Sequence, residues 1–438
     1  MWGKKKDIIG LDIGCSSIKL VELKEDKNGY KLQNLAISPL PPEAIVDGAL
    51  MDSVTIIDTI RDAIAASKTK TKDAVASVSG HSVIVKKISL PLMTEAELEE
   101  SIQWEAERYI PFDVNDVNID FQIFGSAPEN PEVMDVVLVA AKKDIINDYV
   151  SVLMESGLNP VIIDIDSFAL ENMLAISYEI GKEETVAIAN VGASVTNINI
   201  IRSNISAFTR DIFKGGNQIT EEIQRQLHVD HEEAEKIKVG TKVDLTSQAV
   251  VQNVLKTASE SLAVEIGNSL DFFQSTTTYE KISKLYLSGG GSKIKDFDIT
   301  LQQQIGIPVE VVNPFKNIDY RGKDFDLEYL REIGPIMAVA RTTGHGARES
   351  GSAQLPDNRP FWRVGQRSQL RCVQGDTQHH NLALNGEIPR VGWLERDRQP
   401  LLGIDVVDQE VSSVPKPSLH HAVNSKCLST AGQSDRAL

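Results

Sequence analysis

Cysteine is scarce in this sequence of 438 residues, and long hydrophobic runs are missing from it. The three cysteines, Cys15, Cys372 and Cys427, lie far apart, so they give neither a disulfide framework nor the close spacing of a metal site. No apolar stretch approaches the roughly 18 residues of a membrane-spanning helix. Asp12 interrupts the N-terminal apolar run, which therefore does not read as a signal peptide. These absences predict a soluble cytoplasmic protein.

Positive charge is also in short supply. The sequence has 45 Lys and Arg against 62 Asp and Glu, which gives a net charge of −17 and a pI near 5.0. Because such a surface repels phosphate backbones, nucleic acid is excluded as a main partner. The pattern G-x-x-x-x-G-K-[ST] is absent from the sequence, which excludes a P-loop ATPase.

The usage of basic residues changes abruptly near residue 341. Residues 1–341 contain 26 Lys and 8 Arg, whereas residues 342–438 contain 2 Lys and 9 Arg. The hydrophobic periodicity also stops there, and several glycines and prolines follow. We expect residues 342–438 to be an unrelated, disordered tail, with a small folded module as the alternative.

Before that point, strand and helix periods alternate along the chain. The segment that begins at Thr94 opens with a capping box, in which Glu97 follows three residues after the threonine. The mixture predicts two α/β domains with mixed sheets. The expected strands are 7–11, 18–23, 74–78, 83–90, 117–124, 133–141, 186–189, 197–202, 205–210, 284–287 and 309–312, and the expected helices are 53–66, 94–109, 144–156, 218–226, 232–238, 249–273 and one that opens at Ser292.

Three glycine-bearing segments stand next to these strands. They are G-L-D-I-G-C-S-S at 10–17, A-N-V-G-A-S-V-T at 189–196 and L-S-G-G-G-S at 287–292. Glycine lets backbone N–H groups come close to an anion. Two such loops in separate halves of the chain indicate two half-domains facing each other across a nucleotide, and the third suits the flat face of a base. The order is that of the phosphate-1, phosphate-2 and adenosine segments of actin-like proteins.

The run from about residue 7 to 340 resembles the type IV pilus assembly protein PilM family, whose members are related to the cell-division protein FtsA. Besides the three loops, the resemblance rests on the segments 86–91, 105–112, 164–169, 210–216 and 233–238. It implies a two-domain actin-like (ribonuclease H-like) ATPase fold with a small α+β insert subdomain. It ends at residues 334–340, where the family would continue into a helix of small and aliphatic residues.

Periodicity and resemblance together give the expected domain boundaries. They are domain 1 at 1–79 and 157–184, the FtsA-like insert at 80–156, domain 2 at 185–333, a truncated connecting helix at 334–341 and the tail at 342–438.

The cofactors that the resemblance implies are ATP and Mg²⁺. Asp12 would hold Mg²⁺ through water, and Lys19 would bind phosphate. The other expected nucleotide contacts are Gly14, Ser16, Ser17, Asn190, Gly192, Thr196, Gly215, Gly216, Glu235, Lys238, Gly289, Gly290, Gly291 and Ser292. The alternatives are an ordinary tight hairpin at 14–17 and, for Glu235 with Lys238, a surface ion pair on one helix face.

Two residues are candidates for catalysis. Asp166 falls where actin-like ATPases carry the residue that positions the attacking water, and Asp164 is the alternative. For both residues the structural alternative is that they cap the helix that starts near Ser167. Asn190 stands where an aspartate is usual, and an amide cannot act as a base. We therefore expect at most a weak ATPase.

The resemblance implies a cytoplasmic ATP-binding scaffold of the type IV pilus inner-membrane assembly platform, which serves twitching motility and lies at the inner membrane through its partner. That partner is the N-terminal cytoplasmic peptide of PilN, with other platform proteins and motor ATPases as further candidates. The peptide would dock in a groove between the first domain and the insert, beside the helix 98–109, with Trp104 and Arg108 as probes and Ile102 packing inside the insert.

Two other functions share this fold. One is an FtsA-like membrane-tethered filament former. An amphipathic C-terminal helix would support that function, but the sequence of residues 342–438 does not predict one. The other is a sugar-kinase-like phosphotransferase, which the insert at 80–156 argues against. Fold alone does not decide between them.

Overall fold

The structure of the protein is a computed structural model. It describes residues 7–341, apart from short gaps at 27–28, 47, 128–129, 204, 242–247, 278–280 and 321–324, and it also describes Trp362 and Arg363. The chain divides into two compact units, residues 1–376 and 377–438, and every described residue belongs to the first. The predicted disorder of the tail therefore falls outside the described residues, except at positions 362 and 363.

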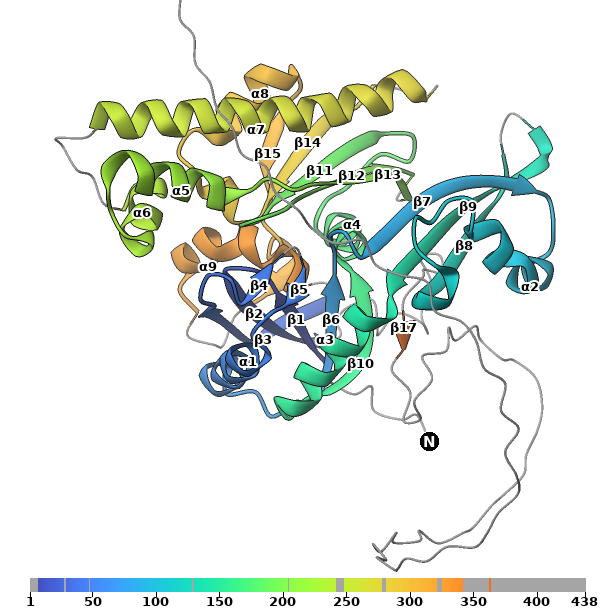
Figure 1. The fold of residues 1–438 in the computed structure, drawn as a ribbon, viewed down its shortest axis with the longest axis horizontal. Coiled ribbons are helices and arrows are strands. Elements are labelled where there is room, and N and C mark those ends of the chain that lie inside the picture. Colours follow the sequence, from blue (N-terminus) through green and yellow to red (C-terminus); the bar gives the residue numbers. More distant parts are fainter. Residues whose placement is uncertain are drawn as a thin grey trace, which may run out of the picture. The chain divides into compact units, whose positions relative to one another are not determined.

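A seven-stranded mixed sheet forms the centre of the first domain (Figure 1). Strands β1, β2 and β3 form an antiparallel meander, while β1, β6 and β10 run parallel. In spatial order the strands are β16 (Ile318–Asp319), β3 (Gly29–Pro39), β2 (Ser17–Asp26), β1 (Ile9–Ile13), β6 (Asp73–Val78), β10 (Asn159–Ile165) and β17 (Trp362–Arg363).

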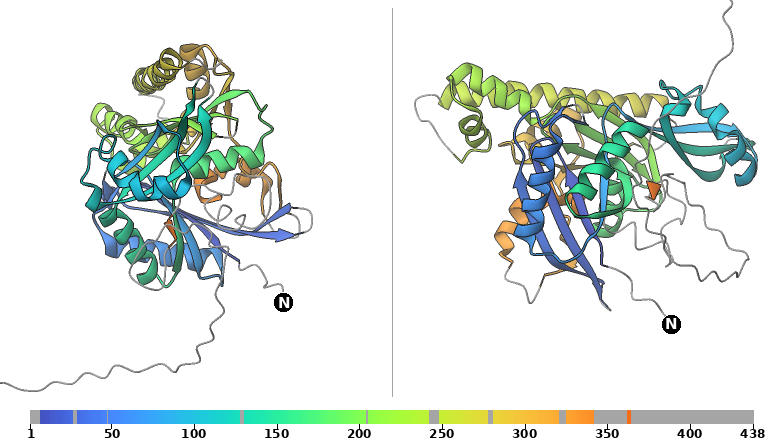
Figure 2. Two further views of the ribbon diagram at one scale, coloured as in Figure 1. Left: turned by 90° about the vertical axis from the view of Figure 1, so that its right-hand side faces the viewer. Right: turned by 60° about the horizontal axis from the view of Figure 1, so that its bottom comes forward.

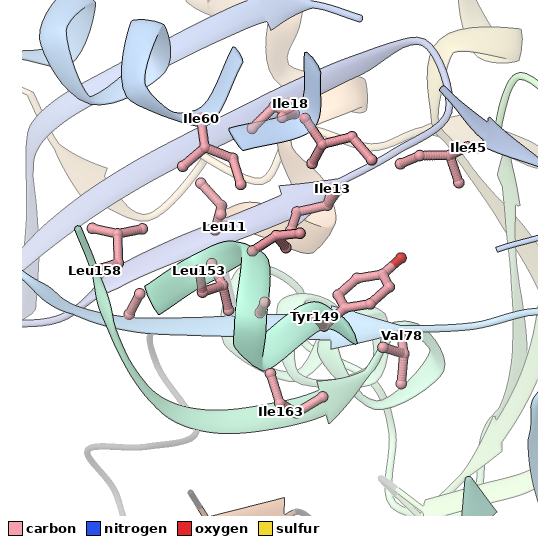
Figure 3. Close-up of a cluster of buried hydrophobic side chains, with 14 of the residues drawn as sticks. Leu11, Ile13, Ile18, Ile45, Ile60, Val78, Tyr149, Leu153, Leu158 and Ile163 are labelled. Carbon is pink, nitrogen blue, oxygen red and sulfur yellow. The ribbon is translucent and has the colours of Figure 1, made fainter. Parts of the chain in front are cut away.

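Two helices cover one face of this sheet, α1 (Ser53–Ser67) and α3 (Lys143–Glu155). Helix α1 begins after Asp52, whose carboxylate accepts a hydrogen bond from the Thr55 N–H at 3.1 Å. Leu11, Ile60, Leu153 and Ile163 meet in the core between helices and sheet (Figure 3). A short hairpin of β4 (Ile45–Val46) and β5 (Ala49–Leu50) borders the same core.

The insert is a three-stranded antiparallel sheet with one helix on it. Its strands lie in the order β7 (Val83–Pro91), β9 (Asn130–Lys142) and β8 (Val117–Ala127), the turn η1 (Val114–Asp116) precedes β8, and α2 (Glu95–Ala106) covers one face. The predicted capping box is present, with Thr94 and Glu97 bonded reciprocally. The sequence grouped α3 with the insert. The helix contacts β9 of the insert, but it also contacts α1, β5, β6 and β10, and Ile146 and Leu153 belong to the core of the first domain.

The second domain is a five-stranded sheet with helices on one side. The sheet order is β13 (Ile205–Ile212), β12 (Thr196–Arg202), β11 (Thr185–Val191), β14 (Lys284–Ser288) and β15 (Val309–Val311). The helices are α5 (Gly216–Leu227), α6 (His231–Lys238), α7 (Gln248–Thr276) and α8 (Phe297–Ile305). The helix expected to open at Ser292 is a 3₁₀ turn, η2 (Gly290–Lys293), and α8 begins only at Phe297, because Asp296 before it has a left-handed backbone (φ 59°).

Helix α4 (Asp166–Ser177) packs against the second sheet and follows directly on β10 of the first. Leu170 and Leu174 share a core with Val186, Ile188 and Tyr286. The chain returns to the first domain through α9 (Leu327–Ile333) and η3 (Gly334–Met337), which pack beside β2 and β3. Within the described residues, no helix combines the length and apolarity needed to span a bilayer.

Arg341 is an exception to the apolar packing of this returning segment. Its side chain is 1% exposed, and none of its three guanidinium nitrogens has a hydrogen-bond partner among the described residues. Burial lowers the pKa of this group to about 10. A buried charge without a partner costs several kcal/mol of stability, and it stands where the PilM-like pattern would continue with small aliphatic residues.

Replacing this arginine with an apolar residue is therefore expected to stabilise the protein. We predict that Arg341→Leu raises the free energy of unfolding by about 1–4 kcal/mol, the range found when buried ionic groups give way to apolar ones. Urea denaturation measures the change, with Arg331→Leu on the exposed side of α9 as the control that leaves stability unchanged. A lower unfolding midpoint for Arg341→Leu would contradict the prediction.

Candidate nucleotide-binding site

A cleft of about 510 Å³ lies between the two sheets and is lined from both. The first domain contributes the β1–β2 turn, the end of β6, one residue of α3 and the start of α4. The second contributes the β11–β12 turn, the starts of α5 and α6, and the turn after β14. The three glycine segments singled out in the sequence therefore come together at one cavity.

The β1–β2 turn is closed by its own backbone. The Gly14 N–H donates to the Ser17 carbonyl at 3.2 Å. A Cβ at Gly14 would lie 2.8 Å from the Nζ of Lys19, so a side chain there would displace the lysine. Lys19 is 3.2 Å from the Asp12 carboxylate, and both side chains are largely buried at the cleft. The turn thus presents one cation and one anion side by side at the cleft, which suits a phosphate with its metal.

The β11–β12 turn is held against the start of α5. The Gly216 N–H donates to the Gly192 carbonyl at 3.0 Å, and the Asn217 N–H donates to the Ala193 carbonyl at 2.8 Å. A Cβ at Gly215 would lie 2.5 Å from the Gly192 oxygen. Gly215 therefore permits this approach but does not line the cleft. The loop and the N-terminus of α5 form one unit at the cleft, and a helix N-terminus of this kind suits an anion such as a phosphate.

Two predicted contact residues act from behind the cleft surface. Thr196 is fully buried, and its hydroxyl donates to the Lys214 carbonyl at 2.8 Å. Ser292 donates to the Gly289 carbonyl at 2.7 Å, which closes the turn after β14. Neither residue lines the cleft, so each supports a loop instead of touching a ligand.

Lys238 and Glu235 join α6 to α5. The Lys238 ammonium donates to Glu235 Oε1 at 2.5 Å, to Thr220 Oγ1 at 2.9 Å and to the Gly216 carbonyl at 3.3 Å. The lysine side chain is 9% exposed and that of the glutamate 37%. The pair is therefore not the surface ion pair considered as an alternative. Lys238 positions the two helices, and both residues line the cleft, Glu235 with the more exposed side chain.

The turn after β14 packs directly on β11. Gly289 has φ 83°, and a Cβ on it would lie 2.4 Å from the Val191 carbonyl oxygen. A Cβ on Gly291 would lie 2.1 Å from Val191 Cγ1. Gly290 has open space around its Cβ position and lines the cleft. The middle glycine therefore offers the flat surface, and its neighbours permit the close packing.

Asp166 is the better placed of the two catalytic candidates. It is the first residue of α4, lines the cleft, and accepts a hydrogen bond from the Ser77 hydroxyl at 2.5 Å. Asp164 accepts from the Ile165 N–H at 2.8 Å and does not line the cleft. Burial, with the nearby charge of Asp12 as a second cause, raises the pKa of Asp166 to about 6.

Asn190 is anchored in a chain of hydrogen bonds that crosses between the domains. Its amide donates to Asn197 Oδ1 at 3.2 Å, and the Asn197 amide donates to Asp211 Oδ1 at 2.8 Å. Asp211 also accepts the Gly80 N–H at 2.9 Å from the β6–β7 connection. Beside this chain, the ring of His81 stacks on that of Phe213. These hydrogen bonds orient the Asn190 side chain, which is a neutral amide.

Several lining residues escaped the sequence reasoning. They include Cys15, Ser77, Ser79, Tyr149, Ser194, Asn217, His231, Glu232 and Lys293. Ser77 and Ser79 stand at the end of a buried strand. That position is visible in the sequence and could have identified them as candidates for the site. Tyr149 could not be found, because α3 was assigned to the insert. Burial raises the pKa of the Tyr149 phenol and, with Ser194 opposing the shift, that of the Cys15 thiol.

The donor set fits magnesium held mainly by a nucleotide. Among the described residues, no cluster of three or more His, Cys, Asp or Glu side chains could hold a metal alone. Magnesium commonly keeps several waters and takes one or two carboxylates together with substrate phosphates. Asp12 at the phosphate end of the cleft supplies such a carboxylate.

The raised pKa of Asp166 makes a prediction about stability. Because the folded pKa lies above that of an unfolded aspartate, folding favours the protonated form, and stability is lost as the pH rises from 4 through 6. Asp166→Asn lacks this loss, so its stability relative to the wild type should increase by about 2 kcal/mol between pH 4 and 7.5. Denaturant titrations measure it, with the exposed Asp58→Asn as control. A difference that stays constant with pH would contradict the assignment.

Comparison with known proteins gives three informative likenesses. A structure of the PilM–PilN type IV pilus biogenesis complex matches with a TM-score of 0.68 and 29% identity over 77% of this chain and 97% of the other. Cell division protein FtsA of Bacillus subtilis (strain 168) is 23% identical over 267 residues, which are 52% of this chain. The match spans 57% of FtsA, less than two thirds of it. EutJ from Carboxydothermus hydrogenoformans matches more weakly, with a TM-score of 0.48 and 14% identity over 78% of this chain and 89% of the other.

The family model described as type IV pilus assembly protein PilM matches residues 10–342. The match covers the three glycine segments, the insert, the second sheet and all of the first sheet except Ile9 and β17. It confirms the predicted family, and the matching solved structure confirms the predicted actin-like fold. The chain belongs to the PilM family of type IV pilus assembly proteins.

Proposed function

We propose that this chain is an ATP-binding scaffold of the type IV pilus inner-membrane assembly platform. The observation that carries the proposal is the cleft, in which Asp12 and Lys19 face two glycine turns from the other domain. A phosphate chain fits between the β1–β2 and β11–β12 turns. The open surface of Gly290 suits a base, and Glu235 suits a ribose hydroxyl.

Binding, and not turnover, is the role that this arrangement supports. Backbone amides and Lys19 hold the phosphates, and a magnesium ion would offset their charge when bound beside Asp12. Asp166 can accept a proton, since a pKa of about 6 leaves it mostly ionised at pH 7. Asn190 is neutral and its amide is already bonded to Asn197. We therefore expect slow hydrolysis, with ATP acting as a structural ligand.

A metal-specific loss of affinity tests the nucleotide site. Asp12→Ala should weaken Mg·ATP binding by about tenfold or more, which corresponds to 1.4 kcal/mol, and should change metal-free ATP binding much less. Calorimetry with magnesium and with EDTA measures both affinities. Asp58→Ala, at an exposed side chain of α1, is the control. Absence of saturable Mg·ATP binding to the wild type would overturn the proposal.

The partner that we propose is the N-terminal cytoplasmic segment of PilN, which would place the chain at the inner membrane. The solved PilM–PilN complex supports this choice of partner. The structure changes the expected place of contact. Helix α2 covers one face of the insert sheet, whereas Val137, Val139 and Ala141 on the other face join the core of the first domain. We therefore propose that the segment docks where the insert meets the first domain, away from α2.

Trp104 becomes a control as a result. It is 73% exposed on α2, while Leu98, Ile102 and Ala106 pack inside the insert. We predict that a synthetic peptide with the N-terminal PilN sequence binds saturably in calorimetry, and that its scrambled form does not. Trp104→Ala should leave the affinity unchanged, since the residue lies outside the groove. Loss of binding in Trp104→Ala would place the peptide on α2 instead.

A further inference from the structure

Three lysines alternate with two threonines in residues 68–72, the loop between α1 and β6, which we call the lysine loop. Lys68, Lys70 and Lys72 are exposed, whereas Thr69 and Thr71 between them are half-buried. None of the three lysines forms an ion pair with another described residue. In a chain with a net charge of −17, the lysine loop is therefore a local concentration of positive charge without an internal partner.

Hydrogen bonds hold the lysine loop against the strands on both sides of it. The Thr71 hydroxyl donates to Glu22 Oε1 of β2 at 2.6 Å, and the Asn159 N–H at the start of β10 donates to the Lys72 carbonyl at 2.7 Å. The Thr71 N–H donates to the Thr69 hydroxyl at 3.1 Å. The backbone and the threonines fix the loop, so its ammonium groups are available to a partner. A backbone fixed in advance lowers the entropic cost of binding.

The hairpin of β2 and β3 adds lysines at the same end of the first sheet. Strand β1 begins at Ile9, opposite Glu22, and the hairpin continues beyond this point and extends past the other strands (Figure 2). Lys24 lies two residues after Glu22, on the same face of β2, and stands opposite Lys31 of β3. Like charges in this position destabilise a strand pair, although Asp319 of β16 is the neighbour of Lys31 on its other side.

The carboxylates at this end are partly occupied by internal hydrogen bonds. Glu22 is 7% exposed and accepts from Thr71 and from the Asn34 amide. The Asp73 carboxylate accepts from the Asn159 amide at 2.7 Å. Two further carboxylates at this end are those of Asp7 and Glu25. The side chains of the lysine loop therefore reach the solvent more freely than Glu22 does.

The sequence brings a second basic cluster to the same end. Lys4, Lys5 and Lys6 lie outside the described residues, and β1 begins soon after them at Ile9, beside the start of β6. Since one residue of chain spans at most about 3.6 Å, these three lysines stay close to this end of the sheet. Trp2 precedes them, and tryptophan favours the interface between a bilayer and water.

We propose that this end of the first domain is a membrane-docking surface, at which the lysine loop, Lys24 and lysines 4–6 bind the headgroups of an anionic lipid bilayer. Clusters of four to eight basic residues are typical of such binding. A flat anionic surface can contact one end of the molecule while the acidic remainder points away from it. An extended nucleic acid would continue past the acidic surface, which repels it. The inference rests on the proposed place at the inner membrane, and it requires no PilN.

This contact would also orient the nucleotide cleft. Strands β1, β6 and β10 run parallel, and all three begin at the end that carries the lysines. Their other ends lead into the β1–β2 turn, Ser77 and Asp166, which line the cleft. The cleft therefore lies at the end of these strands that is farther from the bilayer, where nucleotide can enter from solution.

The test is sedimentation of the full chain with vesicles in the absence of the PilN peptide. One set of vesicles mixes phosphatidylcholine with phosphatidylglycerol, and the other contains phosphatidylcholine alone. The loop variant carries Lys68→Gln, Lys70→Gln and Lys72→Gln. The matched control removes the same charge at exposed lysines around the second domain, with Lys182→Gln, Lys281→Gln and Lys295→Gln.

The wild type should bind the mixed vesicles, bind phosphatidylcholine alone much less, and lose affinity as salt is added. The loop variant should bind the mixed vesicles about tenfold or more weakly than the wild type. The control variant should bind them as the wild type does. Unfolding midpoints in urea show whether both variants are folded.

Three results would overturn the proposal. They are a wild type that does not sediment with the mixed vesicles, equal binding to the two kinds of vesicle, and equal affinity of the loop and control variants. Fluorescence anisotropy with a labelled RNA oligonucleotide tests the other polyanion. RNA binding that only the loop variant loses, without vesicle binding, would assign the lysine loop to nucleic acid. Because the mixtures contain neither ATP nor PilN, failure here leaves the calorimetric tests of the proposed function unaffected.

Discussion

The whole cleft depends on backbone packing against backbone at the glycine turns. Gly215, Gly289 and Gly291 each sit where a Cβ would overlap a neighbouring residue at 2.1 to 2.5 Å. Because these contacts leave no room for side chains, the β11–β12 turn, the start of α5 and the turn after β14 form one rigid wall. The polar groups of the first domain can then face a fixed surface. Side-chain chemistry comes from Asp12, Lys19 and Asp166 on one side, and from residues such as Asn190 and Glu235 on the other.

Helix α4 ties that wall to the opposite one. It leaves β10 of the first sheet at Asp166 and then packs against β11 and β14 of the second through Leu170 and Leu174. Asp166, which lines the cleft, is thus attached to the element shared by both sheets. The hydrogen bonds that link Asn190 to Gly80 make a second tie beyond the end of β6, the same end at which Ser77 bonds Asp166. Both ties therefore lie at one end of the cleft.

The sequence predicted the parts of this fold that are local. The glycine segments, the capping box at Thr94 and the strand–helix alternation all follow from neighbouring residues. It missed β3, where a register shift near Leu23 breaks the strict alternation that marks a strand. It also misplaced α3, since only contacts far apart in the chain assign Tyr149 to the cleft. The supporting roles of Thr196, Gly215 and Ser292 depend on three-dimensional packing that spacing alone does not contain.

The assembly order of the first sheet has a consequence for how the protein folds. Its strands come from residues 9–39, 73–78, 159–165, 318–319 and 362–363, and those of the second sheet lie within 185–311. The first sheet therefore remains incomplete on the ribosome until long after the second domain has been synthesised. Closing such distant pairs costs loop entropy before any contact repays it. During synthesis, the open edges of β3 and β10 are the surfaces that a chaperone would have to shield from pairing with other chains.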